Sequence, residues 1–181
     1  MKKMMFSLVG ILLLIGALPA ALSAQTGSPP ASFTGQANGG EPVIGEPVTY
    51  VDASGNPAAT IVVEEVERVW EEYGEYDMPE QGAEYVAFTV TVESTLGRGA
   101  LEVRRSDFSL QDRAGFVWDV SYADAADGVE VTPLDDDLNL ASGDSATFLV
   151  VFEVLQGQEI EHLYWHPESD RMITLAALVS S

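Results

Sequence analysis

The pattern that most limits how this chain can fold is an alternation with a period of two, in which every second side chain is a large apolar one. It occurs in three runs, residues 84–93, 116–122 and 146–154. Successive side chains of an extended strand point to opposite faces, so each run predicts a β-strand with one apolar face. Such a face is stable only when a second layer covers it. The apolar positions are Val86, Phe88, Val90 and Val92; Phe116, Trp118, Val120 and Tyr122; and Phe148, Val150, Phe152 and Val154.

Shorter segments have the composition of further strands, and glycine, proline, asparagine and aspartate separate them. Residues 112–115, with the sequence Asp-Arg-Ala-Gly, suit a tight hairpin turn that closes on a glycine. Many short strands with regular turns predict an all-β protein. We therefore expect an antiparallel β-sandwich of about eight strands over residues 46–179. The shorter candidate strands are residues 48–51, 101–103, 108–111, 160–165 and 172–178.

One segment, residues 60–73, fits two patterns. Its apolar side chains follow the spacing of a helix whose other face is rich in glutamate. The β-branched run at residues 61–63 instead favours a strand. Because a single helix would interrupt an otherwise all-β pattern, we favour a strand over residues 60–70. The residues at helical spacing are Val62, Val66, Val69, Trp70 and Tyr73.

Residues 1–24 have the composition of a secretory signal peptide. Two lysines precede an apolar run over residues 4–18, and a proline separates this run from a series of small residues. We expect cleavage after Ala24, with Ser23 as the alternative site. An uncleaved membrane anchor is the competing interpretation, because the apolar run approaches the length that spans a bilayer. No cysteine follows the run, which excludes a lipid-anchored lipoprotein.

Residues 25–45 are rich in glycine, proline, serine, alanine, threonine and glutamine, and they contain few aliphatic residues. Such a segment buries too little apolar surface to offset the entropy of ordering, so we expect a flexible linker. It joins the signal peptide to the domain at residues 46–179. The chain is therefore predicted to be exported, to the cell envelope or beyond, with no membrane insertion after the signal is removed.

The charge of the chain excludes several classes of partner. Asp and Glu number 29 and Lys and Arg number 8, for a formal net charge of -21. Nucleic acids select for clustered basic residues, and anionic membrane surfaces repel an acidic chain.

The absence of cysteine excludes disulfides, thiolate metal sites and thiol nucleophiles.

Five segments together resemble telokin-like extracellular bacterial domains, a family that includes a secreted immunoprotective antigen. The segments are residues 80–93 (EQGAEYVAFTVTVE), 107–116 (DFSLQDRAGF), 140–144 (LASGD), 150–154 (VVFEV) and 163–167 (LYWHP). The resemblance implies an immunoglobulin-like β-sandwich. The family has no catalytic signature to transfer to this chain, so the resemblance also implies a non-enzymatic binding or structural module.

The two histidines, His162 and His166, are four residues apart. On a helix they would share one face and suggest zinc. On a strand their Cα atoms would lie about 13 Å apart, which is too far to share an ion. Pro167 and the surrounding composition favour the strand, so we do not expect a zinc site.

An acidic segment has the spacing of a calcium loop. Asp135, Asp137 and Asn139 form a D-x-D-x-N pattern, and Asp144 could supply a further oxygen. Leu140 and Ala146 stand where an EF-hand has glycine and glutamate. The alternative interpretation is a solvated acidic loop, which Asp124, Asp127, Glu130 and Asp136 extend.

No catalytic motif occurs, neither G-x-S-x-G, H-E-x-x-H, a P-loop nor a dinucleotide fingerprint. Trp70, Tyr73 and Tyr76 lie among acidic residues, and they form either an exposed recognition loop or part of the core. Trp118 and Trp165 lie within strand patterns and are expected in the core. We expect an exported, non-enzymatic module that binds an unknown protein partner or has a structural role. The alternative is a calcium-dependent extracellular module.

Overall fold

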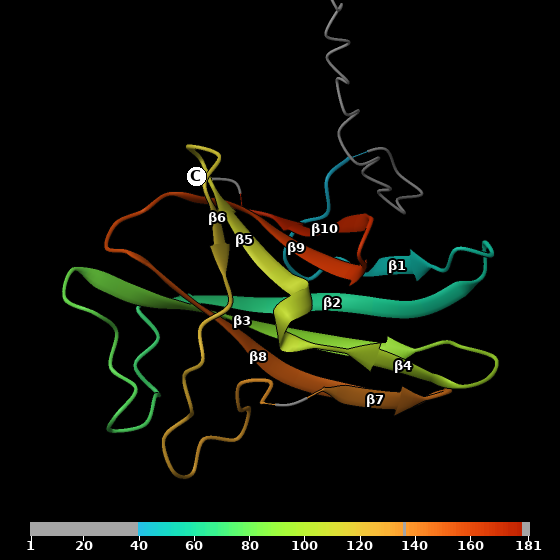
Figure 1. Ribbon diagram of the computed structural model, residues 1–181, viewed down its shortest axis with the longest axis horizontal. Helices are drawn as coiled ribbons and strands as arrows, with labels where there is room; N and C mark the ends of the chain where they lie inside the picture. The colour runs from blue at the N-terminus through green and yellow to red at the C-terminus, as the bar shows by residue number, and fades with distance from the viewer. Residues whose placement is uncertain (1–39, 136, 179–181) are drawn as a thin grey trace, which may run out of the picture.

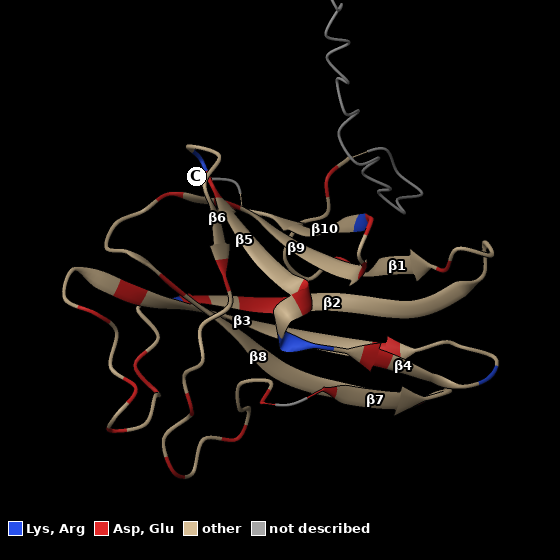
Figure 2. Ribbon diagram, viewed as in Figure 1, with Lys and Arg blue, Asp and Glu red and all other residues tan. Residues whose placement is uncertain are grey.

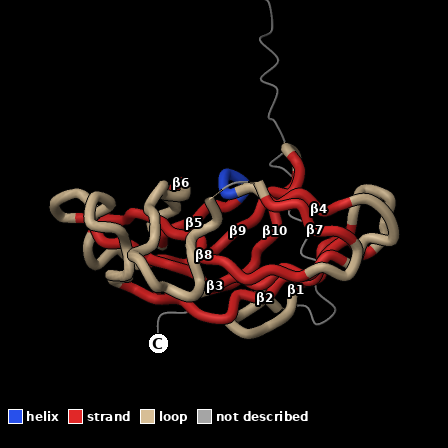
Figure 3. The backbone as a smooth tube through the Cα atoms, turned by 90° about the horizontal axis from the view of Figure 1, so that it is seen from below, coloured by secondary structure: helices blue, strands red, loops and turns tan. Residues whose placement is uncertain are grey.

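A computed structural model describes residues 40–135 and 137–178. The predicted signal peptide and residues 25–39 of the predicted linker lie outside this range. The described chain folds into ten strands, arranged as two four-stranded antiparallel sheets and one two-stranded ladder. The layers are visible in Figure 1 and Figure 3, where the strands stack face to face and loops project at the ends. The predicted all-β sandwich is confirmed.

The first sheet has the strand order β1-β2-β3-β8. The second sheet has the order β10-β9-β5-β6, and β4 pairs with β7 beside the first sheet. A short 3-10 turn, Arg105–Asp107, precedes β5. The strand bounds are β1 Val48–Val51, β2 Pro57–Arg68, β3 Ala83–Ser94, β4 Ala100–Val103, β5 Phe108–Asp112, β6 Val117–Asp119, β7 Leu138–Ala141, β8 Ser145–Leu155, β9 Ile160–Glu168 and β10 Arg171–Ala177.

The main core lies between the two four-stranded sheets, and it is densest where β3 pairs with β8. In this register Val86 lies opposite Phe152, and Phe88 lies opposite Val150. Phe88 and Phe152 are fully buried and meet edge to face, with ring centroids 5.8 Å apart. Because the inward positions of the two strands coincide, the apolar face is continuous across them. The second sheet covers it with Leu110, Leu163, Trp165, Ile173 and Leu175, among others.

The ambiguous segment is a strand, β2, as favoured from the sequence. A β-bulge lies between Val63 and Glu65 in its pairing with β3. Ile61 and Val63 point into the core, and beyond the bulge Val66 packs against the same core. The bulge adds one residue to the strand, so the inward spacing changes from two to three. Trp70 and Tyr73, which share the helical spacing with Val66, lie after the strand in the second core.

The strand predicted for residues 116–122 is much shorter in the structure, because β6 contains only Val117–Asp119. Trp118 and Val120 pack against the core as expected. Phe116 and Tyr122, at the two ends of the run, are 59% and 73% exposed, so the prediction that they are buried is wrong. Phe116 lies in the β5–β6 turn, and Tyr122 comes after β6 has ended.

The β5–β6 turn is fixed by a buried carboxylate. Asp112 accepts hydrogen bonds from the backbone N–H of Phe116 at 2.8 Å and from Nε2 of Gln158 at 2.7 Å. Gly115 has a φ of 85°, and its N–H donates to the carbonyl of Asp112. A left-handed residue at this position strongly favours glycine. The hairpin turn predicted at residues 112–115 is confirmed.

The described chain contacts the sandwich before β1 begins. The carbonyl of Pro42 accepts the N–H of Ala177 in β10, and the N–H of Gly45 donates to the carbonyl of Val63 in β2. Pro42 is buried, and Ile44 packs against the main core. Residues 42–45 therefore lie along the open edge between β2 and β10.

A second, smaller core lies on the outer face of the first sheet. The outward side chains of β3 and β8, such as Tyr85 and Leu149, are buried there beneath the loops 69–82 and 120–137. Trp70 is 1% exposed at the centre of this cluster and packs on the rings of Tyr73 and Tyr85. Both faces of the sheet are therefore covered at this end of the molecule.

Replacing Trp70 with alanine should lower the free energy of unfolding by about 3 kcal/mol, because the second core loses its largest side chain. Tyr76→Ala, which removes an aromatic residue from the same loop, should change it by less than about 0.5 kcal/mol. Tyr76 is 92% exposed. Urea denaturation measures both changes in unfolding free energy, provided that the dependence of this free energy on urea concentration has the same slope in each variant. Equal effects of the two substitutions would show that Trp70 does not belong to a core.

Candidate functional site

Two long loops at one end of the sandwich are joined to each other. The loop 69–82 follows β2, and the loop 120–137 follows β6; both extend from the same end in Figure 1. The N–H of Gly74 donates to the carbonyl of Asp124, and the N–H of Ala126 donates to that of Glu72, both at 2.8 Å. Tyr73 and Ala125 form an antiparallel bridge. The two loops therefore share one base and form a single surface, here called the loop surface.

The loop surface presents apolar side chains to solvent. Tyr76 is almost wholly exposed, and Met78 and Tyr122 are largely exposed. The guanidinium of Arg105 lies over the ring of Tyr122, 3.8 Å from its centroid. Of the three aromatic residues that the sequence placed either in an exposed loop or in the core, Tyr76 is exposed, whereas Trp70 and Tyr73 belong to or pack against the second core.

The loop surface is strongly acidic. Residues 69–82 and 120–137 contain eleven Asp and Glu residues and no Lys or Arg. Figure 2 shows the positions of Asp and Glu, in red, along the backbone of both loops. Exposed aromatic side chains among charges of one sign are typical of surfaces that bind another protein, because tyrosine provides contact area and the charges select the partner.

The four candidate ligands of the predicted calcium loop do not meet at one place. Asp135 and Asp137 line a hollow of about 370 Å³ together with Arg105, Ser106 and Tyr122. Nε of Arg104 lies 3.8 Å from a carboxylate oxygen of Asp137. Asp136 lies outside the described residues. Arginine thus provides the positive charge closest to this part of the acidic segment.

The other two candidate ligands lie elsewhere. Asn139 is in β7, opposite Glu102 of β4. Asp144 lies beyond β7, and its carboxylate accepts the N–H of Ala141 at 3.1 Å. The four residues of β7 extend over about 13 Å, so Asp144 and Asp137 are held at opposite ends of a strand. In the described ranges, no three His, Asp or Glu side chains are arranged to hold a metal ion.

The two histidines lie on β9, as the strand interpretation predicted, and their rings have different partners. Nε2 of His162 is 3.3 Å from a carboxylate oxygen of Glu41. Nε2 of His166 is 2.8 Å from the hydroxyl of Ser109 on β5. His162 thus connects β9 to the segment before β1, whereas His166 connects β9 to β5.

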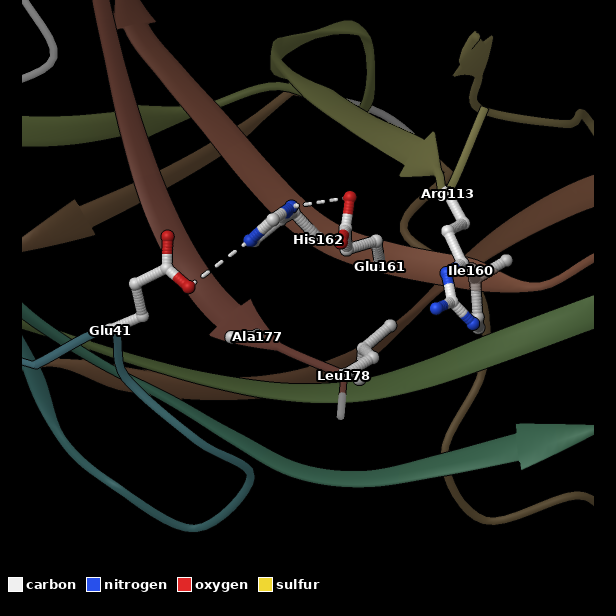
Figure 4. Close-up of a pocket in the computed structure, with 7 residues that line it drawn as sticks. All are labelled: Glu41, Arg113, Ile160, Glu161, His162, Ala177 and Leu178. Carbon is white, nitrogen blue, oxygen red and sulfur yellow. Dashed lines mark hydrogen bonds and ion pairs between the residues drawn. The ribbon is translucent and has the colours of Figure 1, made fainter. Parts of the chain in front are cut away.

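A small hollow surrounds His162 (Figure 4). It has a volume of about 250 Å³, and its walls include Ile160, Ala177 and Leu178. The imidazole lies between two carboxylates, because Nδ1 is 3.7 Å from Glu161 while Nε2 faces Glu41. This arrangement fastens the N-terminal segment to β9. No pattern in the sequence marks Glu41, which lies within the predicted linker.

Ser109 and His166 bring a hydroxyl and an imidazole together, as nucleophilic catalysis requires. Ser109, however, is 7% exposed and lies between Asp119 and Tyr164 in the sheet register. Burial lowers the pKa of His166, and the charge of Asp107 opposes this change. The carboxylate of Asp107 accepts the backbone N–H of Arg104. The pair therefore lies within the sheet as a cross-strand contact.

No family model matches the chain, and no curated protein matches its sequence. Several solved bacterial structures match the chain. MPT63, a secreted protein of Mycobacterium tuberculosis, is 18% identical, with a TM-score of 0.53; the match covers 73% of this chain and 94% of MPT63. At this identity the likeness shows the fold alone.

Two further structures have lower TM-scores. The match to ycdA, a candidate lipoprotein of Bacillus subtilis, has 21% identity and a TM-score of 0.48 and covers 65% of this chain. The chain spans only 35% of the length of ycdA. An uncharacterised β-sandwich protein of Clostridium difficile is 11% identical, with a TM-score of 0.39, and the match covers 74% of this chain and 91% of that protein. No helix in residues 40–135 and 137–178 is long and apolar enough to cross a membrane.

Millimolar calcium should leave the melting temperature of the protein unchanged, because Asp137 is paired with Arg104 and Asp144 lies at the far end of β7. An ion that binds only the folded state must raise its stability, so a thermal melt with calcium or with a chelator is a direct test. A rise of several degrees that Asp137→Asn abolishes would show that the acidic segment does bind calcium.

His166 should make the protein less stable as the pH falls below about 6.5. Burial lowers its pKa in the folded state below the ordinary histidine value of 6.5, so the unfolded chain binds the proton more readily. Neutral His166 makes its full contribution to the unfolding free energy at a pH above its pKa in the unfolded chain. This contribution is lost as the pH falls through the pKa of His166 in the folded protein. Between pH 7.5 and 5.5, His166→Gln should lose less of its unfolding free energy than the wild type. An equal or larger loss in the variant would contradict this assignment.

Proposed function

We propose that this chain is an exported, non-enzymatic β-sandwich module that binds a protein partner at or outside the cell envelope. The observation that carries the proposal is the loop surface, where Tyr76, Met78 and Tyr122 are exposed on two loops that share one base. Tyrosine contributes strongly to protein interfaces because it offers a large contact area at low entropic cost. A shared base holds these side chains in place before a partner arrives, which reduces the cost of binding.

The proposal of export rests on the first 24 residues, with their lysines, apolar run and small residues. The fold likeness to a secreted mycobacterial protein agrees with it. We further propose that the chain belongs with the telokin-like extracellular bacterial domains, on the five segments quoted above. This assignment implies an immunoglobulin-like sandwich without a catalytic signature.

The proposal that the chain is not an enzyme rests on the surroundings of its reactive groups. The hydroxyl closest to an imidazole, that of Ser109, is buried within the second sheet. His162 lies between two carboxylates that fasten the N-terminal segment to β9. Neither arrangement combines an accessible nucleophile with donors for a developing oxyanion, as acyl transfer would need.

Site-directed photo-crosslinking in cells that make the protein natively tests this function. A photo-reactive amino acid at Tyr76 should give one main covalent adduct with an envelope or extracellular protein. The same amino acid at Ser54 is the control, because Ser54 is exposed in the β1–β2 turn, at the other end of β2 from the loop surface. Mass spectrometry identifies the adduct. The absence of an adduct from position 76, or equal amounts of adduct from positions 76 and 54, would contradict the proposal.

A further inference from the structure

A groove with an acidic rim runs along the outer face of the first sheet, beside the loop surface. One wall is formed by Glu65 and Glu67 of β2, and the other by residues 127–131 of the loop after β6. The groove has a volume of about 550 Å³. It therefore has room for several side chains, and it lies over the second core. Its five carboxylates are those of Glu65, Glu67, Glu72, Asp127 and Glu130.

The carboxylates of the groove have no cationic partner within the described part of the chain. Five of them line it, and none forms an ion pair with an arginine or histidine of residues 40–135 or 137–178. Burial, followed by the charges of Glu72, Glu65 and Glu71, raises the pKa of Glu67. The nearest arginine in sequence, Arg68, is paired with Glu84 instead. A ligand that brings positive charge would relieve this mutual repulsion.

The floor of the groove is apolar, and one of the lining residues holds an unusual donor. Val131 and Leu149 line it together with Trp70. Nε1 of Trp70 is buried and has no hydrogen-bond partner among the described residues. Buried donors are nearly always paired in folded proteins, so this N–H favours a ligand that brings an acceptor. The groove thus offers negative charge at its rim and apolar surface at its floor, and one of its lining residues, Trp70, holds a buried donor without a partner among the described residues.

We propose that this groove binds an extended, lysine- or arginine-rich segment of the partner protein. The proposal rests on the proposed function and specifies the chemistry of the partner. Ammonium or guanidinium groups would pair with the rim carboxylates, and their aliphatic stems would cover the apolar floor. Backbone carbonyls of an extended segment supply acceptors of the kind that Trp70 lacks. A small inorganic cation would satisfy the charges and leave the apolar floor uncovered.

The rim carboxylates are exposed, so each ion pair with the partner should be weak and sensitive to salt. Binding of a short basic peptide is therefore expected to weaken as the salt concentration rises. The total negative charge of the chain would also attract any polycation. Binding in the groove must therefore be distinguished from this non-specific attraction, and two variants that lose the same number of charges make the distinction.

The probe is a fluorescein-labelled peptide of about ten residues with alternating lysine and alanine and neutral ends, long enough for several side-chain contacts. Its binding to the purified protein is followed by fluorescence anisotropy. The triple variant Glu65→Gln, Glu67→Gln, Glu72→Gln should bind it about tenfold more weakly than the wild type. The matched variant Glu93→Gln, Asp119→Asn, Asp170→Asn loses three charges from exposed positions outside the groove and should weaken binding only about twofold.

A second measurement locates the bound peptide. Carbodiimide coupling joins the lysine amines of the same peptide to nearby carboxylates, and the adducts should concentrate on Glu65, Glu67, Glu72, Asp127 and Glu130. Equal weakening by the two triple variants, adducts spread evenly over the exposed acids, or no binding at low salt would each overturn the proposal. If photo-crosslinking at Tyr76 captures a partner and any of these results is also obtained, the proposed function is retained and only the proposal of binding in the groove is contradicted.

Discussion

The register between β3 and β8 determines the rest of this structure. Eleven residue pairs align without a shift, from Ala83–Leu155 to Glu93–Ser145. The alignment turns Phe88 and Phe152 inward to the main core, and it turns Tyr85 and Leu149 outward to the second core. Because side chains alternate along a strand, a slip of one residue would exchange the two sets. Both cores, and the loops that rest on the second one, depend on this pairing.

Much of the fold could be predicted from the sequence because alternation is a local property. Residues 84–93 and 146–154 give a clear period of two, and both are strands in the structure. The pattern of β2 was ambiguous because its helically spaced residues serve different cores: Val66 packs on the main core, whereas Trp70 lies beyond the strand in the second core. β7 was missed because only Leu138 and Leu140 alternate there, directly after a run of three aspartates.

The candidate site was harder to predict because it depends on contacts between distant segments. Trp70 and Tyr76 have similar acidic neighbours in sequence, yet one is buried by Leu149 and Val151 of β8 and the other is in solvent. The groove joins β2 to residues 127–131, about sixty positions later, and no local pattern indicates that these segments meet. For the histidines, local geometry was sufficient, because an extended strand holds residues four apart at separate places.

The bridge between Tyr73 and Ala125 has a consequence for engineering. It anchors the loop 69–82 on one side, and on the other side the N–H of Ala83 donates to the carbonyl of Glu80 as β3 begins. The stretch between these anchors leaves and rejoins the framework at fixed points, as do the hypervariable segments of antibodies. Foreign sequences could therefore be displayed at residues 75–79 while the hydrophobic support beneath them stays intact.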